Sequence, residues 1–122
     1  RLSRPLRQDG RKGIPRMHDE DGLAGLRRRI DSLDDRIVDL LGERFALVRE
    51  VAAYKSRRNI PAVIPERIEQ VIERCIARGR RHGLDAEMLR DVYRRLIQEA
   101  CRVEEEILSV RGRSASTAVA HD

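Results

Sequence analysis

The segment LLGERFALVREVAAYKSRR (residues 40–58) places two cations on the apolar side of a helix. Apolar residues recur in alternating steps of four and three through this segment and the residues before it, the heptad pattern of helices that pack along one seam. The seam residues are Leu26, Ile30, Leu33, Ile37, Leu40, Leu47 and Val51. The same count passes through Arg44, and Lys55 follows Val51 by a further four residues, on the same side of the helix. The stretch therefore predicts a long pairing helix and raises the question of why its apolar side holds cations.

The rest of the chain predicts two further helices and no strand. Residues 23–56 contain no proline, so they form one helix, about 50 Å long at 1.5 Å per residue. The prolines of RRNIPAVIP (57–65) interrupt that helix, and the second proline suits the first turn of a helix over residues 66–81. Asp85 is a good N-cap for a third helix, which ends near residue 110. The predicted fold class is all-α, with a long, a short and a medium helix.

A helix as long as the first cannot bury its whole seam against two shorter helices of the same chain. Roughly half of the seam would stay in water, an apolar patch larger than soluble monomers expose. We therefore predict a homodimer in which the long helices pair and the two chains are intertwined.

The net charge of +5 belongs to the N-terminal tail. Residues 1–16 hold six of the 26 basic residues and one of the 21 acidic ones, which leaves twenty of each in the remainder. This balance excludes a nucleic-acid partner that binds the folded part through a basic face. We expect a disordered basic tail over residues 1–20, a helical domain over 21–110 and a flexible tail over 111–122. Met17 is a candidate native start, in which case the residues before it are upstream or added sequence.

The remaining residue types exclude several other kinds of site. Cys75 and Cys101 have neither CxxC spacing nor a nearby histidine pair, so we expect reduced packing residues rather than metal ligands or nucleophiles. Tyr93 is likewise expected to be a packing residue. No apolar run approaches the roughly 20 residues of a membrane span, and there is no signal-peptide core. We expect a soluble cytoplasmic protein with no membrane partner.

Charged side chains from two helices are predicted to meet on the inward side. Arg44 and Lys55 are eleven residues apart, so they share one helix face at about 16 Å along the axis. Glu104 follows the inward Ala100 by four residues and faces the same interior. Long cationic side chains can cover apolar surface while their heads reach water. Two of them on one stripe, beside Arg27, favour instead a cavity that binds a small anion.

Three segments resemble the all-helical chorismate mutases. GLRRRIDSLDDRIVDLLGERFALVREVAAYK (25–55) is similar to their long first helix, which typically reads LRxxIDxxDxxLxxLLxxRxxLxxxVxxxK. PERIEQVIER (65–74) resembles the start of their second helix, and YRRLIQEACRVEEE (93–106) resembles their third. The spacing of one arginine, a second arginine seventeen residues on and a lysine eleven further is fairly specific. The resemblance covers residues 23–108.

The resemblance implies an intertwined homodimer with active sites shared between the chains. Such enzymes promote the [3,3] pericyclic rearrangement of chorismate to prephenate, with no cofactor and no metal. By position, Arg44, and Arg27 from the partner chain, would bind the carboxylates of a dicarboxylate substrate, a task that suits bidentate guanidinium groups. Lys55 and Glu104 would hydrogen-bond the ether oxygen. The other matched substrate contacts are Arg67 and the wall residues Val51, Ile97 and Ala100.

Two isoleucines depart from the family's pattern. Mutases that act on chorismate commonly have acidic residues near the C4 hydroxyl, at the positions that Ile64 and Ile68 occupy here. An apolar end of the pocket leaves the C4 substituent open. Chorismate, with a hydroxyl, is the expected substrate because it is the commonest in the family, and 4-amino-4-deoxychorismate, a substrate of antibiotic pathways, is the alternative. Isochorismate pyruvate lyases have an apolar residue after PER too, but a shorter loop and a glutamine in place of Glu104. A non-catalytic helical dimer is the remaining alternative, and it does not explain Arg44.

Glu104 also sets a condition on pH. Some members of the family have glutamine here, which donates a hydrogen bond at any pH, whereas glutamate donates only when it is protonated. We therefore expect turnover to fall as the pH rises through the titration of Glu104.

Overall fold

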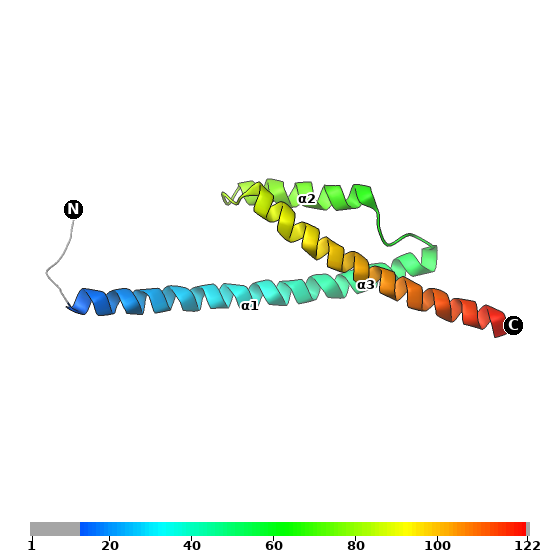
Figure 1. The fold of residues 1–122 in the computed structure, drawn as a ribbon, viewed down its shortest axis with the longest axis horizontal. Coiled ribbons are helices and arrows are strands. Elements are labelled where there is room, and N and C mark those ends of the chain that lie inside the picture. Colours follow the sequence, from blue (N-terminus) through cyan, green and yellow to red (C-terminus); the bar gives the residue numbers. More distant parts are fainter. Residues whose placement is uncertain (1–12, 122) are drawn as a thin grey trace. The chain divides into compact units, whose positions relative to one another are not determined.

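The chain folds into three helices joined by two short connections (Figure 1). The computed structural model describes the backbone of residues 13–121 and the side chains of residues 21–111. The helices are α1 (Gly13–Arg58), α2 (Pro65–Arg80) and α3 (Ala86–His121), and no strand lies within residues 13–121. The predicted all-α class and the order of a long, a short and a medium helix are confirmed. Within the same residues no helix is long and apolar enough to cross a membrane.

Two helices extend further than the sequence pattern predicts. α1 begins at Gly13, because Pro15 lies in the first turn, where its missing N–H costs no hydrogen bond. α3 continues to His121, because residues 111–121 contain no proline and only one glycine to end it. The first twelve residues of the predicted basic tail lie outside the described residues. The division of the chain into two tails and a domain stays a prediction.

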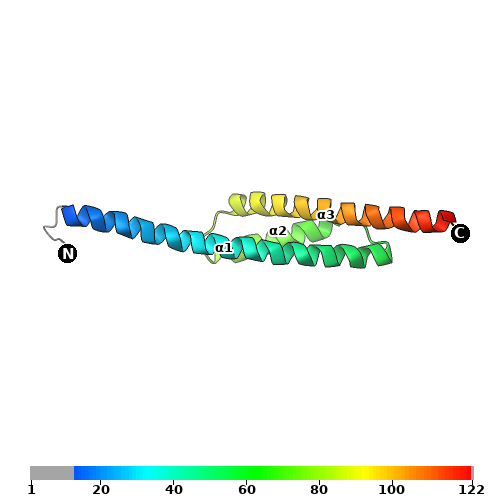
Figure 2. The same cartoon turned by 90° about the horizontal axis from the view of Figure 1, so that it is seen from below.

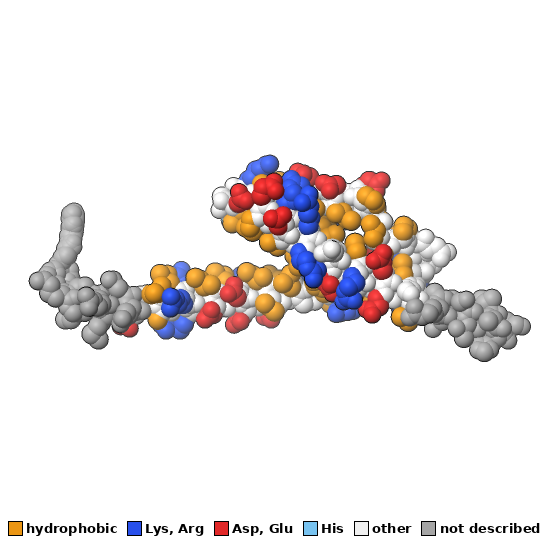
Figure 3. Space-filling model, viewed as in Figure 1, with side chains coloured by type: hydrophobic (Ala, Val, Ile, Leu, Met, Phe, Trp, Pro, Cys, Tyr) orange, Lys and Arg blue, Asp and Glu red, His pale blue; other side chains and the backbone are white. Residues whose placement is uncertain are grey.

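The chain divides into two compact units, and α1 contributes to both. The first unit ends at Gly42, and the second begins at Glu43 and contains the rest of α1 with α2 and α3. In the first unit the predicted seam is open to solvent, and Figure 3 shows its apolar side chains along one edge of α1. Five seam side chains of this unit are between 51% and 59% exposed: Leu26, Ile30, Leu33, Ile37 and Leu40.

A tight connection joins α1 to α2 in the second unit. Asn59 adopts the left-handed conformation (φ 55°), and the Ile60 N–H donates to the Lys55 carbonyl oxygen at 3.0 Å, which closes the last turn of α1. Ile64 is extended, as expected before a proline, and Pro65 begins α2. The connection therefore ends with the Ile64 side chain next to the start of α2.

α2 and α3 form a hairpin in which α3 turns back along α2 (Figures 1 and 2). Its core cluster consists of Val71, Ile72, Ile76 and Ile97. The helices approach closely at Gly79, where a Cβ atom would overlap the Leu89 side chain. The predicted N-cap is confirmed, since Asp85 Oδ2 accepts a hydrogen bond from the Met88 N–H at 2.9 Å. This hairpin is the frame that positions the site described next.

Candidate active site

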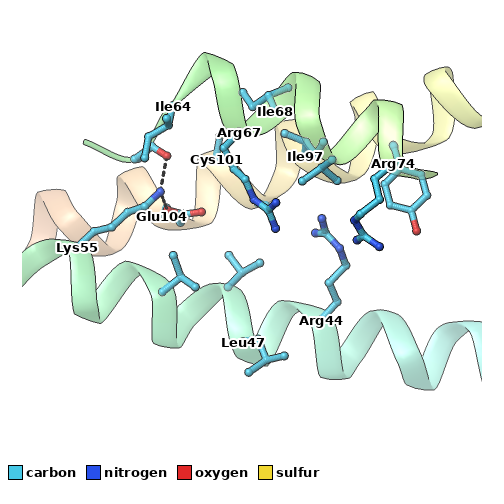
Figure 4. Close-up of a pocket in the computed structure, with 16 residues that line it drawn as sticks. Arg44, Leu47, Lys55, Ile64, Arg67, Ile68, Arg74, Ile97, Cys101 and Glu104 are labelled. Carbon is cyan, nitrogen blue, oxygen red and sulfur yellow. Dashed lines mark hydrogen bonds and ion pairs between the residues drawn. The ribbon is translucent and has the colours of Figure 1, made fainter. Parts of the chain in front are cut away.

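The second unit contains a cavity of about 380 Å³ between the C-terminal part of α1 and the hairpin of α2 and α3 (Figure 4). Its charged lining consists of four cations and one carboxylate: Arg44, Lys55, Arg67, Arg74 and Glu104. Its other lining residues are Leu47, Val48, Val51, Ala62, Ile64, Ile68, Val71, Tyr93, Ile97, Ala100 and Cys101. The cavity is therefore apolar in its walls and cationic in its charge, a combination that fits a small organic anion.

A buried ion pair marks one end of the cavity. Lys55 Nζ donates to Glu104 Oε1 at 2.7 Å and to the Ala62 carbonyl oxygen at 2.8 Å. The two side chains are 13% and 10% exposed. Burying both charges is tolerable because each is hydrogen-bonded to the other, whereas removing one partner would leave an uncompensated charge. The pair holds the ammonium group at the cavity wall, and two of its three N–H groups are used in these bonds.

Arg44 lies further along the same face of α1 and lacks such a partner. Its Nη1 atom is buried and has no hydrogen-bond partner among the described residues. The guanidinium carbon lies 5.9 Å from the centroid of the Tyr93 ring, a cation–π contact that leaves the N–H groups free. Leaving a buried N–H unpaired costs about 1–3 kcal/mol, and more for a charged group. The buried guanidinium group of Arg44 therefore lacks an acceptor among the described residues.

α2 contributes two arginines to the opposite wall. Arg67 and Arg74 are seven residues apart, so they lie on one face of the helix, two turns from each other. Figure 4 shows both side chains directed into the cavity, toward Arg44. Arg67 Nη1 also donates to Gln70 Oε1 at 2.7 Å, an exposed bond that orients its guanidinium group.

The two titratable groups next to these charges are held in their neutral forms. Burial raises the pKa of the Cys101 thiol, and the Glu104 carboxylate raises it further. A thiol with a raised pKa is a poor nucleophile. The pKa of the Tyr93 hydroxyl is raised mainly by burial, and to a smaller extent by the hydrogen bond with the Cys75 thiol. Within residues 21–111, no group of three or more His, Cys, Asp or Glu side chains is placed to hold a metal ion.

The structure brings together nine of the ten site residues predicted from the sequence. Those that line the cavity are Arg44, Val51, Lys55, Ile64, Arg67, Ile68, Ile97, Ala100 and Glu104. The tenth, Arg27, lies in the first unit and does not line it. The sequence interpretation missed Arg74, although its position seven residues after Arg67 was a usable signal. It also treated Tyr93 as a packing residue, which is correct, but Tyr93 lines the cavity as well.

Comparison with known proteins finds several relatives of this chain. The family model described as chorismate mutase type II matches residues 26–105. A 4-amino-4-deoxychorismate mutase of Streptomyces venezuelae is 36% identical over 93 residues, which cover 76% of this chain and 90% of that protein. A 4-amino-4-deoxychorismate mutase of Streptomyces pristinaespiralis is 32% identical over 99 residues, 81% of this chain and 77% of that protein. The T-protein of Enterobacter agglomerans is 34% identical over 84 residues, 69% of this chain but only 22% of that protein.

Proposed function

Since the chain belongs to the chorismate mutase type II family, we propose that it is a mutase that rearranges a chorismate-type dicarboxylate without a cofactor. In a [3,3] rearrangement one C–O bond breaks and one C–C bond forms within the same molecule, so no group passes to the protein. Such a step needs no nucleophile. It needs the flexible substrate held in its folded, reactive shape, and hydrogen-bond donors aimed at the ether oxygen, where negative charge develops.

The observation that carries this proposal is the buried, unpartnered Nη1 of Arg44. A carboxylate at this point would pair the free N–H groups, and a guanidinium group can bind both carboxylate oxygens at once. The cavity's four cations against one carboxylate also match a dianion. A coiled-coil adaptor would gain nothing from an unpaired cation inside a cavity, so the scaffold alternative leaves Arg44 unexplained.

Lys55 and Glu104 provide the donors for the ether oxygen in this proposal. The Lys55 ammonium group has three N–H donors and uses two of them, on Glu104 and on the Ala62 carbonyl. Its third donor is available to the substrate. Glu104 becomes a second donor when it is protonated. Preorganised donors of this kind contribute about 3 to 4 kcal/mol each to stabilising the transition state.

A second copy of the chain completes the site in this proposal. The exposed seam of the first unit needs cover, because soluble monomers rarely leave a continuous apolar stripe of this length in water. The α1 helices of two chains would bury it and form an intertwined homodimer, and Arg27 of the second copy would bind the other carboxylate. Light scattering tests the assembly: a particle of twice the 14.1 kDa chain mass is expected, and a monomer would contradict it.

The C4 substituent of the substrate has two candidates. The amino substrate is favoured by one observation, since two relatives that this chain matches over most of their own length are 4-amino-4-deoxychorismate mutases. Chorismate is the second candidate, because the family model that matches residues 26–105 is described as chorismate mutase type II. The side chains of Ile64 and Ile68 carry no charge and no hydrogen-bond acceptor. They therefore do not discriminate electrostatically between a hydroxyl and an amino group at C4.

Product analysis distinguishes these functions. The protein is incubated separately with 4-amino-4-deoxychorismate, chorismate and isochorismate, and the products are identified by NMR. We expect rearranged product from the first substrate, and from chorismate if the pocket tolerates the hydroxyl. Salicylate and pyruvate from isochorismate alone would indicate a lyase, and no turnover of any of the three would favour a non-catalytic dimer.

A further inference from the structure

One cation of the cavity has no role in the chemistry described so far. Arg74 lies on α2, seven residues after Arg67, and lines the same cavity as Arg44. The other two arginines of α2 downstream of it, Arg78 and Arg80, do not line this cavity. Arg74 therefore differs from Arg78 and Arg80 because its side chain is directed into the cavity.

Arg74 and Arg44 approach the same point from opposite walls. Figure 4 shows the Arg74 side chain coming from α2 and the Arg44 side chain from α1, with their guanidinium groups directed toward each other. Arg44 lies 5.9 Å from the centroid of the Tyr93 ring, and both cations lower the pKa of the Tyr93 hydroxyl against the larger effect of burial. Two like charges placed in this way repel each other unless an anion lies between them.

No carboxylate of the described residues supplies that anion. The ion pairs and hydrogen bonds among residues 21–111 include neither Arg44 nor Arg74. Glu73, the acidic neighbour of Arg74 on α2, lies 3.6 Å from Arg90 of α3 and is directed there. The one carboxylate of the cavity, Glu104, is bound to Lys55. The anion that neutralises the two arginines must therefore come from outside this part of the chain.

We propose that Arg74 is a substrate-binding residue that, together with Arg44, holds one carboxylate of the substrate from two sides. This inference rests on the proposed function and adds a residue to it. A carboxylate that reaches the buried Nη1 of Arg44 presents its second oxygen to the opposite wall, where Arg74 can donate to it. Because the Arg74 side chain is exposed to solvent, its contribution is to affinity and orientation, while Arg44 makes the more buried contact.

Substitution of Arg74 tests the inference with a matched control. Arg74→Gln is compared with Arg78→Gln, another exposed arginine one turn further along α2 that does not line the cavity. We expect the first variant to raise KM about tenfold, the factor that corresponds to 1.4 kcal/mol of binding energy, with kcat changed less than about threefold. We expect the control to keep the parent KM. The KM of Arg74→Lys should fall between those of the parent and Arg74→Gln, since lysine keeps the charge but cannot bind both carboxylate oxygens as a guanidinium group does.

Chemical rescue separates contact with the substrate from a structural role. Guanidinium ion added to Arg74→Ala should restore part of the lost affinity, because the exposed position is open to a small cation, and should leave the parent and Arg78→Ala unaffected. An Arg74→Gln variant with the KM of its control, or no rescue of Arg74→Ala, overturns the inference while the mutase function stands. If the parent turns over neither candidate substrate, the mutase proposal fails. The inference is then tested by measuring the Kd of chorismate by isothermal titration calorimetry. An Arg74→Gln variant that binds chorismate with the same Kd as the parent overturns it.

Discussion

Glu104→Gln removes one charge from the ether-binding end of the cavity and leaves the shape of the side chain almost unchanged. In the parent, Lys55 Nζ donates to Glu104 at 2.7 Å and to the Ala62 carbonyl oxygen at 2.8 Å. The glutamine oxygen can still accept from Lys55, so one charged acceptor is replaced by a neutral one. The free energy of unfolding should fall by about 1 kcal/mol, the difference between charged and neutral hydrogen bonds. Complete loss of a buried partner would cost about 3–5 kcal/mol.

The same substitution should raise the rate at alkaline pH. An ionised Glu104 has no proton to donate, and it repels the negative charge that develops on the ether oxygen. The amide of glutamine donates at every pH. A fixed donor at this position is worth a factor of about 10² to 10³ in kcat. The variant should therefore exceed the parent in kcat/KM at alkaline pH, and its own pH profile should be flat.

The assay follows kcat/KM from about pH 5 to 9 for the parent, Glu104→Gln and the control Glu105→Gln, whose side chain is exposed on α3. Unfolding by urea is measured at one fixed protein concentration, because the stability of an oligomer depends on it. A flat parent profile, with Glu104→Gln indistinguishable from both the parent and the control at every pH, would refute the role of Glu104 as a donor.

Three further predictions concern packing, assembly and the cavity thiol. Gly79→Ala should lower the free energy of unfolding by about 1–3 kcal/mol, since its Cβ overlaps a leucine of α3, and urea unfolding measures this. Leu33→Glu should shift the light-scattering mass from dimer to monomer, while Val38→Glu, 64% exposed outside the seam, should not. Burial raises the pKa of Cys101, so its alkylation by iodoacetamide, followed by mass spectrometry, should become fast only at a higher pH than for a free thiol. The folded thiol keeps its proton where the unfolded one ionises, so this group makes stability fall at alkaline pH.

The helices were predictable because their signals are local. The heptad seam and the two prolines of residues 57–65 determine where α1 stops and α2 begins, whatever the rest of the chain does. The outer ends were less predictable, since Pro15 is compatible with either a tail or a first helical turn. Residues 111–121 have neither a strong breaker nor an apolar period, so the pattern alone could not show that α3 continues through them.

The site was predictable where a residue breaks a pattern or matches a family motif. Arg44 and Lys55 interrupt an apolar stripe, and Glu104 follows an inward position, so the charge itself is the signal. Arg74 breaks no pattern, because an arginine on the exposed part of a short helix is ordinary. Only the packing of α2 against the cavity shows that this arginine lies beside Arg44, and that packing depends on three helices at once.

The central claim is that the cavity of the second unit is a mutase site, and it is tested most directly by the rate of rearrangement in an Arg44→Ala variant. The control is Arg49→Ala, an exposed arginine of α1 that does not line the cavity. With 4-amino-4-deoxychorismate and with chorismate, we expect Arg44→Ala to lose at least about a hundredfold in kcat/KM, as loss of a preorganised donor does, and Arg49→Ala to match the parent. An Arg44→Ala variant that rearranges either substrate at the parent rate would contradict the account.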